Sequence, residues 1–190
     1  MHIKSLVCAF VLFFLSVGSE SARAYDNKLD VAIGYFSVNG TNNDTNKKAA
    51  VSGVGAYQIR YRRALTSHFD FAAGYSLYFK QVITGSSIYG LNLEVIYFPL
   101  SASGTIESKT DNITLSVAER LRPFVSGSFL QRNFSGLQTT FVGFGAGAGA
   151  EYTLTQNMSF ISYARYAMLN ATSLSTATEL TLTAGLVFGF

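Results

Sequence analysis

Beyond residue 24 the sequence alternates, with a period of two, between large apolar residues and small or polar residues. The segment Phe69–Lys80 shows this most clearly. One set of alternate positions holds Phe69, Phe71, Ala73, Tyr75, Leu77 and Phe79, and the other holds Asp70, Ala72, Gly74, Ser76, Tyr78 and Lys80. Successive side chains of a β-strand point to opposite faces, whereas a helix would scatter the aromatic residues around its circumference. The segment is therefore predicted to be a strand.

The alternation recurs about eight times along the chain, which predicts an all-β protein. The apolar positions of the other regular segments are Leu29, Val31, Ile33 and Tyr35; Tyr57, Ile59 and Tyr61; Tyr89, Leu91, Leu93, Val95 and Tyr97; Val142, Phe144, Ala146, Ala148, Ala150 and Tyr152; and Leu180, Leu182, Ala184, Leu186, Phe188 and Phe190. Two segments are less regular. In Arg122–Arg132 neither alternate set is clearly apolar, and in Met158–Leu169 the assignment depends on pointing Arg165 inward. Polar breaks such as Asn39–Ala50 separate the predicted strands.

The two faces of these strands differ in a way that indicates a membrane-embedded barrel. One face is large and aromatic, and the other is glycine, alanine, serine and charge. A single segment places Gly143, Gly145, Gly147 and Gly149 on one face, which predicts that this face has no room for side chains. Bulky aliphatic residues would fill the core of a soluble β-protein, whereas small and charged residues suit the narrow lumen of an eight-stranded barrel. The aromatic face would then meet lipid. The sheet must close, because an open edge in lipid leaves backbone groups unpaired.

Strand length and aromatic placement agree with a membrane crossing. Predicted strands of about nine to twelve residues match a tilted crossing of the hydrocarbon layer. Aromatic residues also cluster at one set of predicted strand ends, as an interfacial girdle would. They are Tyr61, Phe69, Tyr97, Tyr152, Phe160 and Phe190. An even number of strands would place both termini of the chain on the same, periplasmic side.

The first 24 residues have the pattern of a cleaved secretory signal peptide. Lys4 supplies a positive start, Leu6–Val17 is an almost unbroken apolar run, and Ala22-Arg23-Ala24 is a small-x-small cleavage pattern. The alternative, an N-terminal membrane anchor, needs roughly twenty apolar residues, and this run has about twelve. We therefore predict cleavage after Ala24, with residues 1–24 as the signal peptide and residues 25–190 as one barrel domain.

Composition excludes several classes of protein. The 190 residues are 48% hydrophobic and 13% charged, which is too apolar for a disordered chain or a nucleic-acid-binding tail. A net charge of +3 does not call for nucleic acid as a partner. Cys8 is the only cysteine and precedes the predicted cleavage point. A mature chain would therefore have no disulfide, cysteine zinc site or thiol nucleophile.

The C-terminal sequence carries the most specific motif. Thr183, Gly185, Phe188 and Phe190 form a polar-x-Gly-x-x-aromatic-x-aromatic pattern that ends on the last residue. The pattern resembles the β-signal read by the outer-membrane barrel assembly machinery. Together with the Pro123-Phe124-Val125 strand start and the glycine-alternating segment, it makes the chain from Asp30 onward similar to the small eight-stranded OmpA/OmpX-like outer-membrane barrels of Gram-negative envelopes.

This resemblance implies a closed, antiparallel, up-and-down transmembrane barrel of eight strands. It also implies an outer-membrane location, a monomeric state, and contact with outer-membrane lipid and lipopolysaccharide. The connection Pro99–Leu121 is long for a periplasmic turn. Three interpretations of it stay open: a short helix capped by Asn112, an extra hairpin around Lys109–Asn112 that would give ten strands, or a periplasmic loop.

Charged residues on the predicted lumen face form the candidate site. They are Arg60, Arg62, Asp70, Glu94, Glu151 and Arg165. An unpaired charge in a narrow lumen costs several kcal/mol, so we expect these residues to pair in a structural network that fills the lumen. The alternative is a gated ion path in which the Arg60–Glu94 pair opens as a switch.

The sequence predicts no enzyme, metal site or cofactor. Outer-membrane lipid A acyltransferases, deacylases and omptin-like proteases rely on histidine, and His68, the one histidine after residue 24, falls in a predicted periplasmic turn. No His, Asp and Glu cluster has metal-ligand spacing. The predicted role is therefore structural: envelope maintenance or presentation of short loops, where Lys47 and Lys48 could touch lipopolysaccharide phosphates. A narrow OmpW-like channel for small solutes and a soluble periplasmic lipocalin-like carrier are the alternatives.

Overall fold

The computed structural model describes residues 27–42, 47–66, 68–79, 87–99, 105–110, 113–118, 120–135, 139–155, 157–171 and 175–190. The predicted signal peptide, with Ala22 and Ala24 at its cleavage pattern, lies outside these residues. No helix in the described part of the chain is long and apolar enough to cross a membrane.

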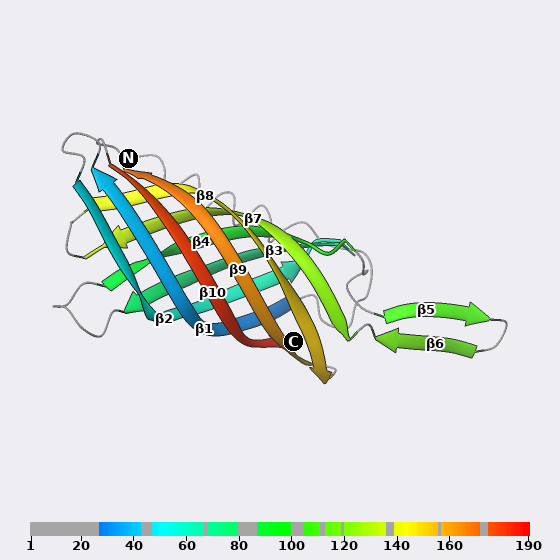
Figure 1. The fold of residues 1–190 in the computed structure, drawn as a ribbon. Helices are drawn as coiled ribbons and strands as arrows, with labels where there is room; N and C mark the ends of the chain where they lie inside the picture. Colours follow the sequence, from blue (N-terminus) through cyan, green and yellow to red (C-terminus); the bar gives the residue numbers. More distant parts are fainter. Residues whose placement is uncertain are drawn as a thin grey trace.

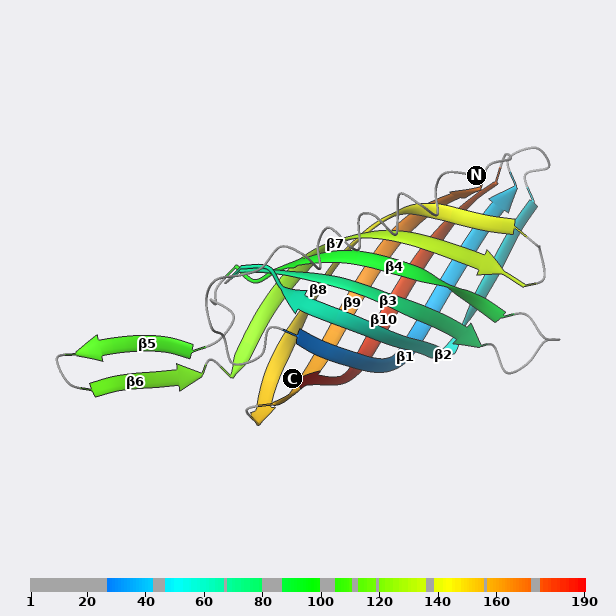
Figure 2. The ribbon, with the colours of Figure 1, turned by 180° about the vertical axis from the view of Figure 1, so that it is seen from behind.

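The described residues form ten β-strands, eight of which close into a barrel (Figures 1 and 2). The strands are β1 (Asn27–Asn42), β2 (Lys47–Ala64), β3 (Phe69–Phe79), β4 (Ser87–Tyr97), β5 (Thr105–Thr110), β6 (Ile113–Ala118), β7 (Leu121–Phe134), β8 (Thr139–Thr155), β9 (Met158–Ala171) and β10 (Ser175–Gly189). Around the barrel the order is β1-β10-β9-β8-β7-β4-β3-β2, and every neighbouring pair is antiparallel. The predicted closed eight-stranded barrel is confirmed.

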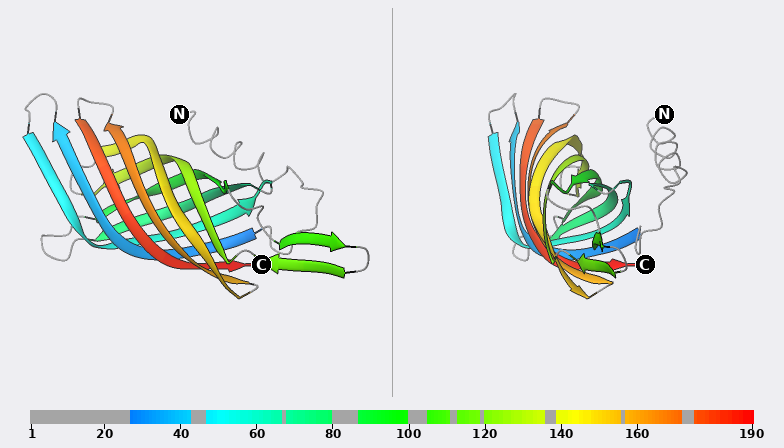
Figure 3. Two further views of the ribbon diagram at one scale, coloured as in Figure 1. Left: turned by 45° about the vertical axis from the view of Figure 1, so that its right-hand side comes forward. Right: turned by 90° about the vertical axis from the view of Figure 1, so that its right-hand side faces the viewer.

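The long connection between β4 and β7 contains a separate hairpin. β5 pairs with β6, with Thr110 opposite Ile113 at the turn, and this two-stranded sheet projects beyond the barrel (Figure 3). β4 pairs directly with β7, with Tyr97 opposite Val125, so the hairpin does not enter the wall and a ten-stranded barrel is wrong. The predicted short helix is also wrong, because Ile113–Ala118 is extended. Its β-branched residues favour a strand. Asn112, the proposed cap, lies outside the described residues.

The two ends of the barrel can be distinguished by the ends of the chain. We call the end where β1 begins and β10 finishes the inner end, and the opposite end the outer end.

β1 and β2 pair as far as Asn42 opposite Lys47, so most of the predicted break Asn39–Ala50 is strand. The barrel strands are 11 to 18 residues long, and several exceed the predicted length. Asparagine, threonine and lysine near the outer end continue the ladder because backbone pairing does not require apolar side chains.

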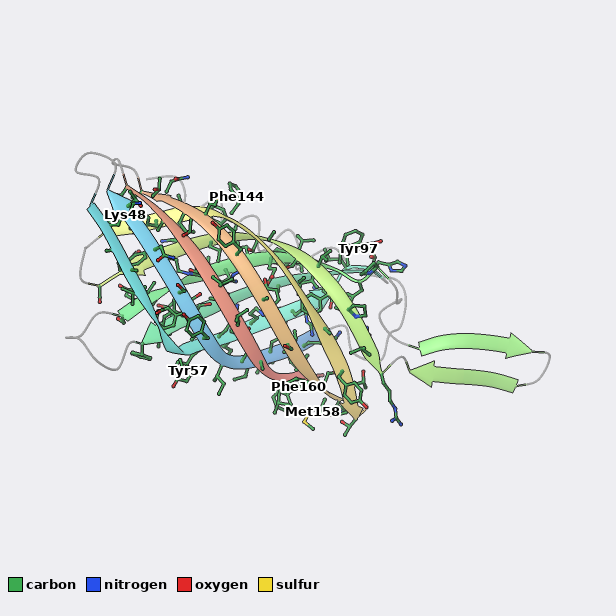
Figure 4. All side chains as sticks on the ribbon, viewed as in Figure 1. Lys48, Tyr57, Tyr97, Phe144, Met158 and Phe160 are labelled. Atoms are coloured by element: carbon green, nitrogen blue, oxygen red, sulfur yellow. The ribbon has the colours of Figure 1, made fainter. Side chains whose placement is uncertain are left out.

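Large apolar side chains cover the outside of the barrel, as the alternation predicts. Tyr57, Phe144 and Phe160 project from the wall (Figure 4) and are 50%, 73% and 43% exposed, whereas the alternate positions of the same strands point into the lumen. Packing also decides which side chains point inward in the two irregular segments. In β7 the inward set contains Phe124, Leu130 and the arginines, and in β9 Arg165 points inward while Tyr166 and Met168 point outward.

The predicted aromatic girdle lies at the inner end. Phe69 and Tyr97 are opposite each other in β3 and β4, with ring centroids 4.9 Å apart. Tyr152 is opposite Phe160 in the same way. Close by, the Tyr61 hydroxyl donates to Asn27 Oδ1 at 2.6 Å, and the Phe190 N–H donates to the Asn27 carbonyl at 3.0 Å. These contacts join the start of β1 to β2 and to the chain end.

Candidate functional site in the lumen

Charged side chains from all eight barrel strands point into the lumen. All six predicted residues are there, and each is at most 2% exposed. Five further charged residues share the lumen at 9% exposure or less. They are Lys28, Asp30, Arg122, Arg132 and Glu179. The described residues therefore place eleven charges in the lumen, and the site is defined by how these charges pair.

Eight of these charges form one connected group, which we call the inner cluster. Its members are Lys28, Asp30, Arg60, Arg62, Asp70, Glu94, Arg122 and Glu151. Arg60 bridges two strands, because its Nη1 lies 2.6 Å from Glu94 Oε2 and its Nη2 lies 3.0 Å from Asp30 Oδ2. The predicted Arg60–Glu94 pair is thus formed, with a second carboxylate on the same guanidinium.

Arg62 is the centre of the inner cluster. Its Nη2 donates to Glu151 Oε2 at 2.8 Å and lies 3.4 Å from Asp30 Oδ1, and its Nε lies 3.7 Å from Asp70 Oδ2. Lys28 and Arg122 close the cluster toward the inner end. Lys28 Nζ is 3.6 Å from Asp70 and 3.9 Å from Glu151, and Arg122 Nη1 is 3.7 Å from Glu151. Each carboxylate of this group therefore has at least one cation within 4 Å.

The remaining three charges form the outer cluster, which consists of Arg132, Arg165, Glu179 and the hydroxyl of Tyr78. Glu179 accepts from Arg132 Nε at 2.7 Å, from Arg132 Nη2 at 3.0 Å and from Arg165 Nη2 at 2.9 Å. The Tyr78 hydroxyl donates to Glu179 at 2.7 Å. It also accepts from Arg132 at 3.1 Å and from Arg165 at 3.2 Å. One carboxylate thus serves two guanidinium groups and a phenol.

Tyr163 lies between the two clusters. Its hydroxyl donates to Glu94 and lies 3.1 Å from the Ser126 hydroxyl. The Cζ atoms of Arg60 and Arg165 are 5.1 and 6.0 Å from the centre of its ring. The ring thus contacts one arginine of each cluster, at distances where cation–π attraction acts.

The glycine face of β8 makes room for aromatic rings in the lumen. A Cβ atom on Gly147 would lie 2.6 Å from the Tyr163 ring, and one on Gly149 would lie 2.6 Å from the Phe124 ring. Real Cβ atoms do not approach this closely. The predicted absence of space on this face is thus explained, because large rings from β9 and β7 pack against the β8 backbone at Gly147 and Gly149.

Apolar side chains fill much of the rest of the lumen. Toward the outer end, Phe36, Ile88, Leu130, Phe141 and Leu169 belong to one buried cluster together with Tyr78. A second cluster contains Ile96, Phe98, Phe124, Ile161 and Val187, together with Tyr163. The side chains that enclose the charges thus also exclude water from them. In such surroundings, removing one partner of a buried ion pair destabilises a protein by about 3–5 kcal/mol.

The four residues of the C-terminal motif take different positions on β10 and on Phe190, which directly follows it. Phe188 and Phe190 point outward, at 39% and 66% exposure, and Thr183 points into the lumen. Gly185 lies so close to β1 that a Cβ atom there would be 2.5 Å from the Ala32 Cα atom. The motif thus lies along the strand that closes the barrel against β1.

His68 and the acidic residues do not assemble a second polar site. The His68 Nδ1 atom is 2.9 Å from the Phe98 carbonyl oxygen, in the turn between β2 and β3 at the inner end. Among the described residues, no group of three or more His, Cys, Asp or Glu side chains is arranged to hold a metal ion.

Sequence reasoning missed five lumen charges for identifiable reasons. Asp30 and Glu179 lie on the polar alternate positions of their segments, so the alternation could have predicted that both point into the lumen. Arg122 and Arg132 lie in the segment where neither alternate set is clearly apolar, and their inward direction depends on packing. Lys28 precedes the regular part of its segment.

Solved structures match the chain by fold. Neisserial surface protein A (NspA) matches with a TM-score of 0.57 and 16% sequence identity, over 89% of this chain and 100% of that chain. The chain has the fold of a small outer-membrane β-barrel. Weaker matches are the N-terminal barrel domain of Pseudomonas aeruginosa OprF (TM-score 0.48, 17% identity, 87% and 99% covered) and Ail, the attachment invasion locus protein of Yersinia pestis (TM-score 0.43, 13% identity, 86% and 99% covered). No protein-family model and no curated protein sequence matches the chain.

The predicted OmpA/OmpX-like fold is confirmed by this comparison. The apolar exterior fits the same type of barrel, because large side chains that face outward need a hydrocarbon environment. The predicted outer-membrane location agrees with both observations.

Proposed function

We propose that this protein is an integral outer-membrane barrel with a structural role in the envelope, and that its lumen is a packed interior instead of a solute path. The observation that carries this proposal is the enclosure of eleven charges, in two ion-pair clusters, among buried apolar side chains. A conducting lumen needs a hydrated path, whereas these side chains occupy the lumen of a barrel that is just wide enough to hold them.

The exterior supports insertion into a membrane. Aliphatic and aromatic side chains such as Ile33, Tyr57, Phe144 and Met168 are half or more exposed and surround the barrel. A soluble carrier of the lipocalin type would place such residues around a ligand cavity and polar ones outside. This barrel has the opposite distribution, so the carrier alternative is disfavoured.

A gated channel is disfavoured by the same contacts. Opening the Arg60–Glu94 pair would not free a path for solutes. Arg60 would still be paired with Asp30, and Glu94 would still accept a hydrogen bond from Tyr163. The apolar cluster around Phe36 and Leu130 would remain in place. A switch would therefore have to displace several packed side chains at once.

Planar-bilayer recording tests the proposal. We expect the purified protein, inserted in the bilayer, to show conductance close to that of the bare membrane, with a general porin inserted in parallel as the positive control. Fractionation and heat-dependent gel mobility should place the folded protein in the membrane fraction. A large, stable conductance would overturn the packed-lumen role. Recovery of the protein in the soluble periplasmic fraction would overturn the membrane role.

We further propose that the barrel assembly machinery reads the C-terminal motif. Phe188 and Phe190 point outward on the closing strand, where a receptor can reach them before insertion. We expect Phe188→Ala with Phe190→Ala to lower the amount of inserted protein in cells without preventing folding of the purified chain into detergent micelles. Phe160→Ala is the matched control, because it removes an exposed inner-end aromatic outside the motif. Equal losses for both variants would contradict a motif-specific role.

The proposed role involves no catalysis, and the outer loops offer the contacts with other molecules. Lys48 is exposed at the outer end (Figure 4), where we expect it to contact lipopolysaccharide phosphates. The side chain of Lys47, predicted to share this contact, lies outside the described part of the structure. We expect a monomer, in keeping with a barrel whose charges pair within its own lumen.

A further inference from the structure

The two ion-pair clusters differ in their formal charge. The inner cluster pairs four basic residues with four acidic residues, so its charges balance. The outer cluster has Arg132 and Arg165 but only Glu179. Among the described residues, the outer cluster therefore holds one positive charge in excess.

The excess charge is enclosed where it is most unfavourable. The side chains of Arg132, Arg165 and Glu179 are at most 1% exposed, and the apolar cluster of Phe36, Leu130 and its neighbours packs around Tyr78. A buried charge without a counter-charge destabilises a fold by several kcal/mol. Tyr78, as a neutral phenol, supplies hydrogen bonds but no negative charge.

Within the outer cluster, the unused hydrogen-bonding capacity lies on Arg165; in the charge-balanced inner cluster, Arg60 Nε and Arg62 Nη1 also have no hydrogen-bond partner in the described structure. Arg132 uses all three of its nitrogens: Nε and Nη2 bind Glu179, and Nη1 donates to the carbonyls of Leu91 and Gln131 at 3.2 Å each. Arg165 uses only Nη2, and its buried Nε and Nη1 atoms have no hydrogen-bond partner in the described structure. Two charged donors are thus directed into the lumen without an acceptor.

A neighbouring hydroxyl is also without a partner. The Ser128 Oγ atom is buried, has no hydrogen-bond partner among the described residues, and lies 2.9 Å from the position that a Cβ atom on Gly145 would occupy. Register places Ser128 opposite Gly145 in β8, two residues from Gly147, which is opposite Arg165 in β9. Gly145 and Gly147 add no side chains of their own between Ser128 and Arg165, and the Tyr163 ring packs against Gly147 there.

We propose that the outer cluster binds a small monovalent anion of the chloride class, held by the Nε and Nη1 groups of Arg165 with the Ser128 hydroxyl as a further donor. A single negative charge balances the excess, and a ligand that only accepts hydrogen bonds matches groups that donate them. The anion must be small because packed apolar side chains surround the cluster. Its role is to stabilise the barrel, and this inference does not depend on whether the lumen conducts.

The test is urea unfolding of the purified barrel in neutral detergent micelles, with chloride replaced by gluconate at constant ionic strength. A ligand that binds only the folded state stabilises it in proportion to its occupancy. Above the dissociation constant of the site, each tenfold rise in chloride should raise the ratio of folded to unfolded protein by up to about tenfold. Absence of any chloride dependence in the wild type would overturn the proposal.

Matched arginine substitutions separate a site from a general salt effect. Arg165→Met removes the excess charge and should abolish the chloride dependence, and Ser128→Ala, which leaves all charges in place, should weaken it. Arg122→Met in the balanced inner cluster should lower stability and keep the chloride dependence. Equal chloride dependence in wild type and Arg165→Met would show a non-specific ion effect and overturn the site.

A further measurement excludes a charge supplied by the protein itself. If Tyr78 were ionised and balanced the arginines, the tyrosinate absorption band would appear at neutral pH in the wild type and vanish in Tyr78→Phe. We expect no such band, and its presence together with chloride independence would overturn the proposal.

Discussion

The inner and outer clusters show two ways in which one narrow lumen accommodates charge. In the inner cluster each carboxylate has at least one cation nearby, and Lys28 and Arg122, with side chains 11% and 7% exposed, reach toward the inner mouth. In the outer cluster a single carboxylate carries two arginines and a tyrosine, and its charged side chains are at most 1% exposed. Redundant pairing should therefore buffer the loss of one inner residue, whereas the outer cluster depends on Glu179 alone.

The largest expected effect follows from removing that carboxylate. Glu179→Ala leaves Arg132 and Arg165 buried without a negative partner, and should lower the free energy of unfolding by about 5 kcal/mol, at the upper end for a broken buried pair. Urea unfolding of the folded barrel, followed by gel mobility, measures this change. Glu179→Gln keeps the shape and should be nearly as unstable; a loss below about 1 kcal/mol in both would contradict the dependence on Glu179.

Removing an inner carboxylate should have a smaller effect. Glu94→Ala takes one partner from Arg60 and the acceptor from Tyr163, but Asp30 remains 3.0 Å from Arg60. We expect a loss of about 3 kcal/mol in the same unfolding assay, with conductance unchanged. If Glu94→Ala were as damaging as Glu179→Ala, redundancy would not distinguish the two clusters.

The junction between the clusters can be tested through the β8 glycines. Gly147→Ala would place a methyl group against the Tyr163 ring and the β9 backbone, and should lower the free energy of unfolding by about 1–3 kcal/mol. Gly127→Ala is the control, since its Cβ would meet nothing within 4 Å. Comparable losses in the two variants would show that strand propensity, and not room for Tyr163, is what the glycine provides.

The smallest expected effect is at the inner mouth. Lys28→Met removes two long contacts, of 3.6 and 3.9 Å, while Arg62 keeps both Asp70 and Glu151 within 4 Å. Desolvation of the buried ammonium group offsets much of the attraction over such long contacts, so its net contribution should be small, about 1 kcal/mol or less. Unfolding should therefore shift by no more than that. A loss as large as that of Glu94→Ala would mean that the inner cluster is as strictly balanced as the outer one.

Much of the barrel could be predicted from local sequence. The alternation of Phe69–Lys80 assigns both faces of β3, and the Gly143–Gly149 series predicts a face of β8 without space for side chains. β7 could not be assigned in this way. Its inward set mixes Phe124 and Leu130 with Arg122 and Arg132, because the lumen holds apolar clusters as well as charges. The hairpin β5–β6 was one of three open interpretations, and its position outside the wall depends on the direct pairing of β4 with β7.

In the regularly alternating strands the sequence by itself determined which side chains face lipid and which face the lumen, because that choice depends only on a period of two within the strand. It did not determine which charges meet. Arg62 and Glu151 are 89 residues apart, and Tyr78 and Glu179 are 101 residues apart. Only the register of the eight closed strands brings these residues to the same height in the lumen. The register therefore also decides that one cluster has balanced charges and the other has one positive charge in excess.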